Sequence, residues 1–378
     1  MTAPQKKVFE ESGILIELFD LGEELTAEFK RMYLALARHQ PMEWAAFDSL
    51  SRDFLAGSES YEMDDAFFNN HTALWEWLIA RGRYLQACNL WEERIRLAEE
   101  CDVRNKRGHI HKGTPFYFLG YTHISHRDLY HGFLAMHRAL DEDLNTHVTL
   151  RAITPALSFV KLDSKRSQQF ARHWVEELAH YIEDKLHIYR QEWGGSLSIE
   201  DFRLKFLQRD DLTESVFSFV YQIAFARETE WSFDKSLVAS AFGGISLGAH
   251  LFQLTLITDQ IIGKQHPNPG EWHYFNRLLH LASKYPQLQD LRGRLEDVSG
   301  KTKPPKPVAP VMKEVLDGIF RYRVMAPVTE MEKDFITSYL LRNRGAHSLE
   351  PMDILLHSFP KTLQRILNPL FGSVETLY

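Results

Sequence analysis

Apolar residues recur at helical spacing along most of this 378-residue chain, and this periodicity constrains the fold more than any other feature. In residues 21–38, for example, Leu25, Phe29, Met32 and Leu36 fall on one helical face. No Asn-Gly pair separates two alternating strand patterns, so that hairpin signal is absent. The fold class is therefore predicted to be all-α. The expected helices cover 21–38, two segments of 72–100, two segments of 114–144, 162–193, 198–206, 213–227, 233–263, 311–322, 329–341 and 351–371.

Glycine, serine and proline mark where these helices stop and start. Gly194-Gly195 ends the long amphipathic helix in the manner of a C-terminal cap, and Ser198, followed by acidic residues, begins the next helix. Breaks near Gly82 and near residues 126–128 each divide a helical stretch in two. Residues 301–310, KTKPPKPVAP, predict an extended linker or a surface loop.

Small residues at regular offsets indicate a weak internal repeat. Phe116, Gly120, Gly132 and Met136 stand at offsets that resemble a tetratricopeptide unit, in which small residues let two helices pack closely. An earlier helix pair matches only at a longer offset, so an irregular helical bundle without repeat ancestry is the alternative. We expect two regions: residues 1–195, a partly tetratricopeptide-like sensing or docking region, and residues 196–378, a second helical domain.

Composition excludes several classes of protein. With 44% hydrophobic and 25% charged residues the chain is that of a globular protein, and no run reaches the roughly 18 apolar residues of a membrane helix. The first residues, MTAPQKKVFEESG, lack the apolar core of a secretory signal. Cys88 and Cys101 form no disulfide framework. We therefore expect a cytoplasmic protein with no membrane partner.

The formal net charge of −7 argues against a protein that coats nucleic acid through bulk positive charge. The sign changes along the chain, since lysine and arginine outnumber the acidic residues from residue 300 onward. This local excess of positive charge permits an RNA partner near the C-terminus.

Histidine is abundant, with 18 residues, but its spacing does not suit a metal site. His173, His180 and His187 recur every seventh residue, which separates them by about 10.5 Å along a helix. His123 and His126 have a suitable spacing, but no further ligand is evident beside them. We therefore expect neither a metal nor a cofactor.

One pattern carries chemistry: an arginine and an asparagine followed, after three residues, by a histidine. It occurs at 342–347 (RNRGAH) and at 104–109 (RNKRGH), although only about 0.03 matches are expected by chance. The 342–347 segment follows an apolar helix end and precedes Pro351, so it lies at a junction between helices. The 104–109 segment lies in a run of charge between two repeat-like helices and is predicted to be a solvated loop, with contact to RNA or to a partner as the functional alternative.

An arginine and a histidine together suit RNA cleavage without a metal. The guanidinium remains charged and matches a phosphate, while the imidazole exchanges a proton near neutral pH. In such a site the 2′-hydroxyl attacks the adjacent phosphate, and DNA, which lacks this hydroxyl, is not cut. The candidate catalytic residues are Arg342, Asn343 and His347; the weaker candidates for RNA contact are Arg344, Arg104, Arg107 and His109.

At Arg342, Asn343 and His347 the sequence resembles the HEPN superfamily of prokaryotic ribonucleases. The resemblance covers about residues 233–371 and implies an up-and-down helical bundle that forms a homodimer. It also implies metal-independent endoribonuclease activity with 2′,3′-cyclic phosphate and 5′-hydroxyl ends, and a role as a toxin or as an effector of phage defence or stress. An acidic partner of the motif is expected among Asp259, Glu332 and Asp334.

Two functions remain open from the sequence. The first is the endoribonuclease, with RNA as substrate and with a protein partner or antitoxin at the N-terminal helical region. The alternative is a non-catalytic helical scaffold or regulator that binds RNA, a nucleotide or a protein.

Overall fold

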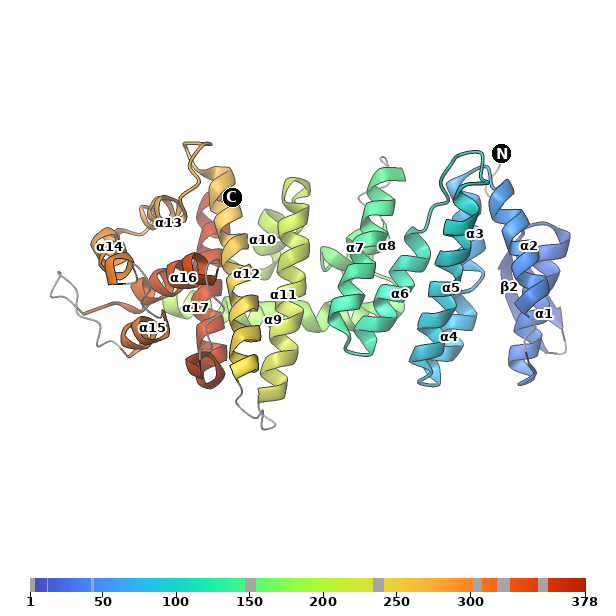
Figure 1. Ribbon diagram of the computed structural model, residues 1–378, viewed down its shortest axis with the longest axis horizontal. Coiled ribbons are helices and arrows are strands. Elements are labelled where there is room, and N and C mark those ends of the chain that lie inside the picture. The colour runs from blue at the N-terminus through green and yellow to red at the C-terminus, as the bar shows by residue number, and fades with distance from the viewer. Residues whose placement is uncertain are drawn as a thin grey trace. The chain divides into compact units, whose positions relative to one another are not determined.

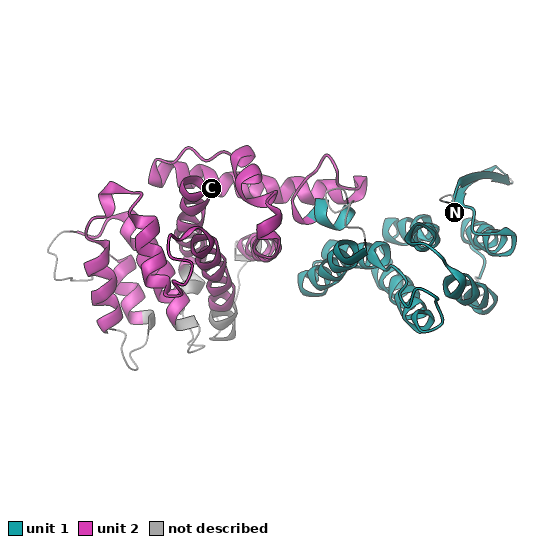
Figure 2. Ribbon diagram, turned by 90° about the horizontal axis from the view of Figure 1, so that it is seen from above, with its two compact units in different colours: residues 1–159 teal, residues 160–378 magenta. Residues whose placement is uncertain are grey.

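The computed structural model describes residues 4–11, 13–41, 44–146, 154–233, 241–301, 308–317, 327–345 and 353–378. Within these ranges the side chains of 231–233, 241–246, 301, 308–309, 344–345 and 353–357 are not described. The chain forms two compact units, Met1–Phe159 and Val160–Tyr378 (Figure 2). This division falls well before the boundary expected at residue 195, because the long helix expected to close the first region belongs to the second unit.

Unit 1, residues 1–159, is helical apart from one hairpin (Figure 1). Its elements are β1 (Lys6–Glu11), β2 (Ile14–Phe19), α1 (Glu23–Ala37), α2 (Trp44–Gly57), α3 (Tyr61–Asn69), α4 (Thr72–Ala80), α5 (Tyr84–Asp102), α6 (Gly113–Ser125) and α7 (Leu129–Thr146). The short helix α8 (Pro155–Val160) spans the division between the units.

Unit 2, residues 160–378, is entirely helical in its described part. Its elements are α9 (Gln169–Trp193), α10 (Ile199–Phe202), a π-helical turn η2 (Arg203–Leu207), α11 (Thr213–Phe233), α12 (Ala241–Gln265), α13 (Tyr274–Ala282), α14 (Leu291–Lys301), α15 (Val308–Leu316), α16 (Glu330–Gly345) and α17 (Asp353–Leu377), with 3₁₀ turns at Asp210–Leu212 and Pro286–Leu288. The predominantly all-α fold class is confirmed.

The predicted helix ends agree with the structure where glycine or serine marks them. Gly194 adopts the left-handed conformation, with φ 68°, directly after Trp193, the last residue of α9. The hydroxyl of Ser198 accepts a hydrogen bond from the Asp201 N–H and so caps α10. Other predicted bounds differ. The structure begins α9 at Gln169 rather than at 162, and α12 at Ala241 rather than at 233, because α11 continues to Phe233. It begins α15 at Val308, inside the segment 301–310 that was expected to be a linker or loop.

The N-terminal hairpin was not predicted. β1 pairs with β2 in antiparallel register, Lys6 opposite Phe19, and Gly13 takes a φ of 77° between the strands. The strands alternate as expected for a half-buried sheet, since Ile16 and Leu18 are buried while Glu17 is exposed. The sheet packs on α1. In the sequence a serine precedes Gly13, and Ser-Gly is a weaker turn signal than Asn-Gly.

The predicted close approach of α6 and α7 is present. A Cβ atom added at Gly120 would lie 2.8 Å from the carbonyl oxygen of Gly132, and one added at Gly132 would lie 2.5 Å from Ile124. Only glycine fits at both positions, because each helix presents its backbone to the other. This contact fits the tetratricopeptide-like prediction; common ancestry of the helix pairs stays a prediction.

The core of unit 2 is built around α17, which packs against α9, α12 and α16 (Figure 1). One buried carboxylate joins three of these helices. Asp334 of α16 accepts hydrogen bonds from Trp193 of α9 at 2.8 Å and from Arg365 and Asn368 of α17 at 2.6 and 2.8 Å. The Asp334 carboxylate therefore connects three helices that lie far apart in the sequence.

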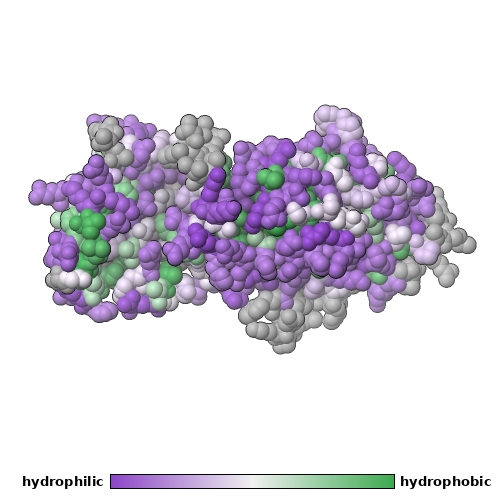
Figure 3. Space-filling view, turned by 180° about the vertical axis from the view of Figure 1, so that it is seen from behind, coloured by the Kyte–Doolittle hydropathy of each residue, from purple (hydrophilic) through white to green (hydrophobic). Residues whose placement is uncertain are grey.

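The visible surface is mainly hydrophilic, with apolar residues in small separate patches (Figure 3). None of the helices in the described ranges has the length and apolar character needed to cross a membrane.

Candidate functional site

Arg342 lies in the last turn of α16, so the helix extends into the RNRGAH segment instead of ending before it. The helix buries Phe335, Ile336 and Leu340 against the core. Ser338 and Arg342 are four residues apart and therefore lie on the same face of the helix. Ser338 bonds the Tyr274 hydroxyl of α13 at 2.6 Å, so this face of α16 is turned toward α13.

Asp259 of α12 holds Arg342. The Arg342 Nε donates to Asp259 Oδ2 at 3.0 Å, and the carboxylate is buried while the arginine side chain is 25% exposed. Asp259 is the only polar partner of Arg342 within the described residues. Because this bond uses Nε and the structure gives the two terminal nitrogens no partner among the described residues, these nitrogens can donate to another group.

A second arginine shares the same carboxylate. Arg277 of α13 donates to Asp259 Oδ1 at 2.7 Å, and its other nitrogens donate to the Glu271 carbonyl oxygen at 2.6 and 2.9 Å. The guanidinium lies over Gly263, where a Cβ atom would come within 2.6 Å of its Cζ. The sequence offered one hint of this arrangement, a glycine one helical turn after Asp259, and no signal for Arg277.

We call Asp259, Arg277 and Arg342 the Asp259 cluster. It places one buried carboxylate between two guanidinium groups, and the Arg277 side chain is 18% exposed. The cluster therefore carries a net positive charge at a partly open position, which suits an anion such as a phosphate. Nearby, burial raises the pKa of the Tyr274 phenol, although its bond to Ser338 opposes the rise, so the phenol is protonated at neutral pH.

The structure distinguishes the three acidic residues that the sequence offered as partners. Glu332 forms a capping box with Thr329, whose backbone N–H and hydroxyl both donate to Glu332 Oε2, and its other oxygen pairs with the buried Arg294 at 2.5 Å. Asp334 belongs to the core network with Trp193, and burial raises its pKa to about 7 in spite of the adjacent Arg365. Of the three, Asp259 is the residue that contacts Arg342.

The remaining residues of the 342–347 segment are only partly described. Asn343 is half-buried at the end of α16. The side chain of Arg344 and all of His347 lie outside the described residues. Of the candidate catalytic residues, the structure thus describes Arg342 and Asn343, together with the residues of α12 and α13 that hold Arg342 in place.

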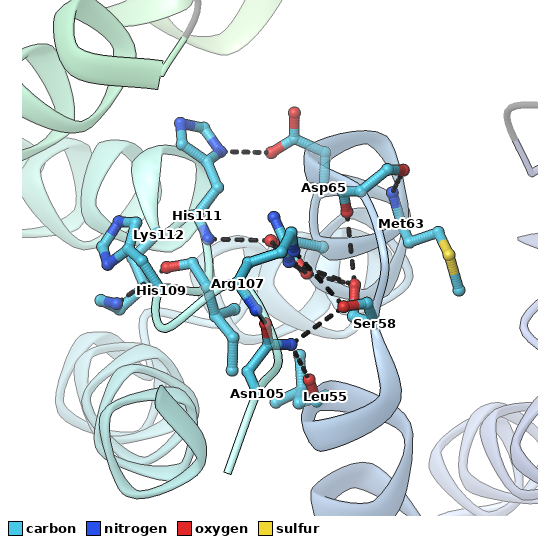
Figure 4. A network of polar contacts seen from close by, with 12 residues as sticks. Leu55, Ser58, Met63, Asp65, Asn105, Arg107, His109, His111 and Lys112 are labelled. Carbon is cyan, nitrogen blue, oxygen red and sulfur yellow. Dashed lines mark hydrogen bonds and ion pairs between the residues drawn. The ribbon is translucent and has the colours of Figure 1, made fainter. Parts of the chain in front are cut away.

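The 104–109 segment has a different environment, between α5 and α6 (Figure 4). The Asn105 side chain is buried and donates to the carbonyl oxygens of Leu55 and Ser58 at 2.7 and 2.9 Å, near the C-terminal end of α2. Its amide oxygen accepts from the Arg107 N–H at 2.9 Å. The asparagine therefore satisfies backbone groups that the end of α2 leaves without helical partners.

Arg107 is paired with Asp64 of α3 through two hydrogen bonds of 2.9 and 2.7 Å. Asp64 is fully buried, and burial raises its pKa, while its bonds to Ser58 and Arg107 offset part of the rise. His109 pairs with Glu142 at 2.8 Å, and Arg104 is exposed. The expected solvated loop is wrong for Asn105 and Arg107, because both are held inside a polar network of unit 1.

The described histidine, cysteine, aspartate and glutamate side chains contain no group of three or more that could hold a metal ion. Comparisons with protein-family models, with curated proteins and with solved structures find no match to this chain.

Proposed function

We propose that the protein is a metal-independent endoribonuclease and that Arg342, Asn343 and His347 form its catalytic segment. The proposal rests on one observation, the bonding and exposure of the Arg342 side chain. Its guanidinium is oriented by Asp259 through Nε alone, is partly exposed, and has a second arginine beside it. An arginine held in this way can bind a phosphate with its terminal nitrogens without first having to be ordered.

Each residue has a distinct role in the proposed reaction. The His347 imidazole accepts the proton of the ribose 2′-hydroxyl, whose oxygen attacks the adjacent phosphorus. Arg342 stabilises the negative charge that develops on the phosphate oxygens, and Asn343 orients the ribose. The bond to the 5′-oxygen breaks and this oxygen takes up a proton, which leaves a 2′,3′-cyclic phosphate and a 5′-hydroxyl. Asp259 and Arg277 are positioning residues.

The biological setting is part of the proposal. The resemblance at residues 342–347 favours a cytoplasmic homodimer in which two segments face each other, acting as a toxin or as an effector of phage defence or stress. Unit 1 is then the region that senses a signal or binds a protein partner or antitoxin.

The test is RNA cleavage by the full-length protein in the presence of EDTA. We expect a single-stranded RNA to be cut to 2′,3′-cyclic phosphate ends and the matching DNA to stay intact. Arg342→Ala should lower the rate by about 10² to 10³, the usual cost of removing one group that stabilises a developing anion. His347→Ala should abolish cleavage. Arg104→Ala, which removes the first residue of the second copy of the pattern, is the matched control and should cut like the wild type.

A second function is favoured by the ion pair itself, since an arginine bonded to a buried carboxylate also suits a non-catalytic role in RNA or nucleotide binding. The same assay separates the two. RNA that binds in an Arg342-dependent manner but is not cut, even by the dimer, would contradict the nuclease and support the scaffold.

A further inference from the structure

A cavity of about 590 Å³ opens in unit 1, far in sequence from the Asp259 cluster. Its walls come from the end of α1, the start of α2, and helices α4 and α5. The residues that give it chemical character are Trp44, Asp48, Trp77, Arg83, Glu93 and Arg94. This volume is typical of sites that bind small organic molecules.

Arg94 is the unusual residue of this cavity. It is only 3% exposed, and its Nη2 donates to Asp48 Oδ1 at 2.6 Å. Its Nε and Nη1 are buried and have no hydrogen-bond partner in the part of the chain that the structure describes. Leaving a buried, charged donor unpaired costs free energy, so these two nitrogens favour an acceptor brought in from outside.

The charged residues that line the cavity also favour an anionic ligand. Both acidic residues have a cation as partner, since Asp48 pairs with Arg94 and Glu93 pairs with Arg96. Arg83, at the rim, has no carboxylate within salt-bridge distance in the described ranges. Among its described lining residues the cavity therefore offers unmatched donors from Arg83 and Arg94 and no unmatched carboxylate, which selects for a negatively charged group.

Two indole rings supply the apolar part of the wall. The Arg83 guanidinium lies 5.3 Å from the centre of the Trp77 ring, and the Arg94 guanidinium lies 5.4 Å from that of Trp44. Leu74, Leu78 and Leu90 also line the cavity. Each indole thus stands beside a cation, so a flat ligand can contact an aromatic surface with its ring and an arginine with its charged end.

We infer that this cavity is a binding site for a small organic anion with a planar ring, the ring packing against Trp44 and Trp77 and the anionic group pairing with Arg94 and Arg83. The inference is independent of the proposed nuclease, because it uses residues of unit 1 only. If unit 1 senses a signal, as the proposed function has it, this small molecule is the signal.

Isothermal titration calorimetry of the full-length protein tests the inference with two matched pairs of probes. Adenosine 5′-monophosphate is compared with adenosine, and indole-3-acetate with indole-3-acetamide. At least one anion should bind about tenfold more tightly than its neutral partner, and for the adenosine pair quenching of tryptophan fluorescence should accompany binding. The pair that responds tells phosphate from carboxylate. If both anions bind no better than their neutral partners, the inference is overturned.

Variants of the cavity arginines test the assignment of residues, and the first is at the exposed Arg83. Arg83→Gln should weaken the responding anion at least fivefold and leave its neutral partner unchanged. Arg81→Gln is the matched control, because Arg81 also lies over the Trp77 ring, at 4.0 Å, but does not line the cavity. Arg94→Lys keeps the buried charge but removes the unpaired Nε and Nη1 donors, so it should weaken the responding anion as well, once circular dichroism has shown that the variant is folded. Equal losses in the Arg81 and Arg83 variants would overturn the assignment.

Discussion

The same arrangement of arginine, asparagine and histidine occurs once in each unit, and the structure gives the two copies different tasks. In unit 1, Asn105 and Arg107 of the 104–109 segment turn inward, where Asn105 bonds carbonyl oxygens at the end of α2 and Arg107 pairs with Asp64 of α3. The Nη1 of Arg107 has no hydrogen-bond partner among the described residues, but it is itself buried. In unit 2, Arg342 is fixed through one nitrogen by Asp259, and its other two nitrogens have no partner among the described residues. A short pattern therefore becomes a candidate site only when its arginine keeps donors on a partly exposed side chain, as Arg342 does.

The largest expected effect is on the stability of unit 1. Arg107→Ala leaves the fully buried Asp64 without its cation, which should cost about 3–5 kcal/mol of unfolding free energy. Amide hydrogen exchange of peptides from α3 and α6 measures the loss locally. Arg104→Ala serves as control and should exchange like the wild type. An Arg107 variant with unchanged exchange would show that the network does not stabilise the loop.

The stability of unit 1 should also depend on pH, because His111 belongs to the same polar network as Arg107 and Asp64. Burial opposes protonation of His111, but Asp143 and Asp65 outweigh it and raise its pKa to about 9. A raised pKa stabilises the fold fully below the unfolded pKa, near 6.5, and this contribution, about 3 kcal/mol, disappears as the pH rises through 9. In urea denaturation, wild type and His111→Gln should therefore differ most at about pH 6 and least at about pH 10. A difference that grows with pH would contradict the pairing.

The two asparagines should separate stability from activity. Asn105→Ala removes two donors to buried carbonyl oxygens and should cost about 2 kcal/mol, with no effect on RNA cleavage. Asn343→Ala should change the unfolding free energy by less than about 0.5 kcal/mol but slow cleavage. Urea denaturation and the cleavage assay are applied to both proteins. Loss of cleavage in the Asn105 variant alone would reverse our assignment.

The smallest effect concerns the support of Arg342. Gly263→Ala pushes the Arg277 guanidinium away from α12, while alanine is itself the better helix former by about 1 kcal/mol, so the melting temperature should hardly change. Cleavage should fall about tenfold, because Asp259 and Arg342 shift with Arg277. Gly293→Ala in α14, where an added Cβ meets nothing within 4 Å, is the matched control. Equal cleavage rates of the two variants would show that Arg277 does not position Arg342.

Most helices could be predicted from residues that are neighbours in the sequence. The hairpin and the partner of Arg342 could not, because they depend on contacts between distant residues or on a weak turn signal. Helical periodicity and the glycine at 194 predicted α9 and its end, since both depend on neighbouring residues. The β1–β2 hairpin was missed because its turn at Gly13 lacks the strongest turn signal. The site followed the same rule: Asp259 was one of three acidic candidates, and only the packing of α12 against α16 selects it.

Arg277 could not be predicted at all, because nothing in its own neighbourhood in the sequence points to Asp259. The partners of Asn105 were equally hidden, since they are backbone carbonyl oxygens contributed by another helix. Backbone acceptors have no signature in the sequence. The pattern of arginine, asparagine and histidine was thus visible, but the difference between its two copies was not.

The central place of α17 in unit 2 bears on how the chain is made. Asn368 of α17 donates to Glu192 of α9 and to Asp334 of α16, both at 2.8 Å, so the earliest and latest helices of the unit meet at one side chain. During synthesis the helices of unit 1 that pack against one another leave the ribosome before unit 2 does. Helix α9, in contrast, can pack against α17 only after the last residues of the chain have been made. A nascent chain therefore completes the unit that bears the cavity before the unit that holds Arg342 can close around its last helix.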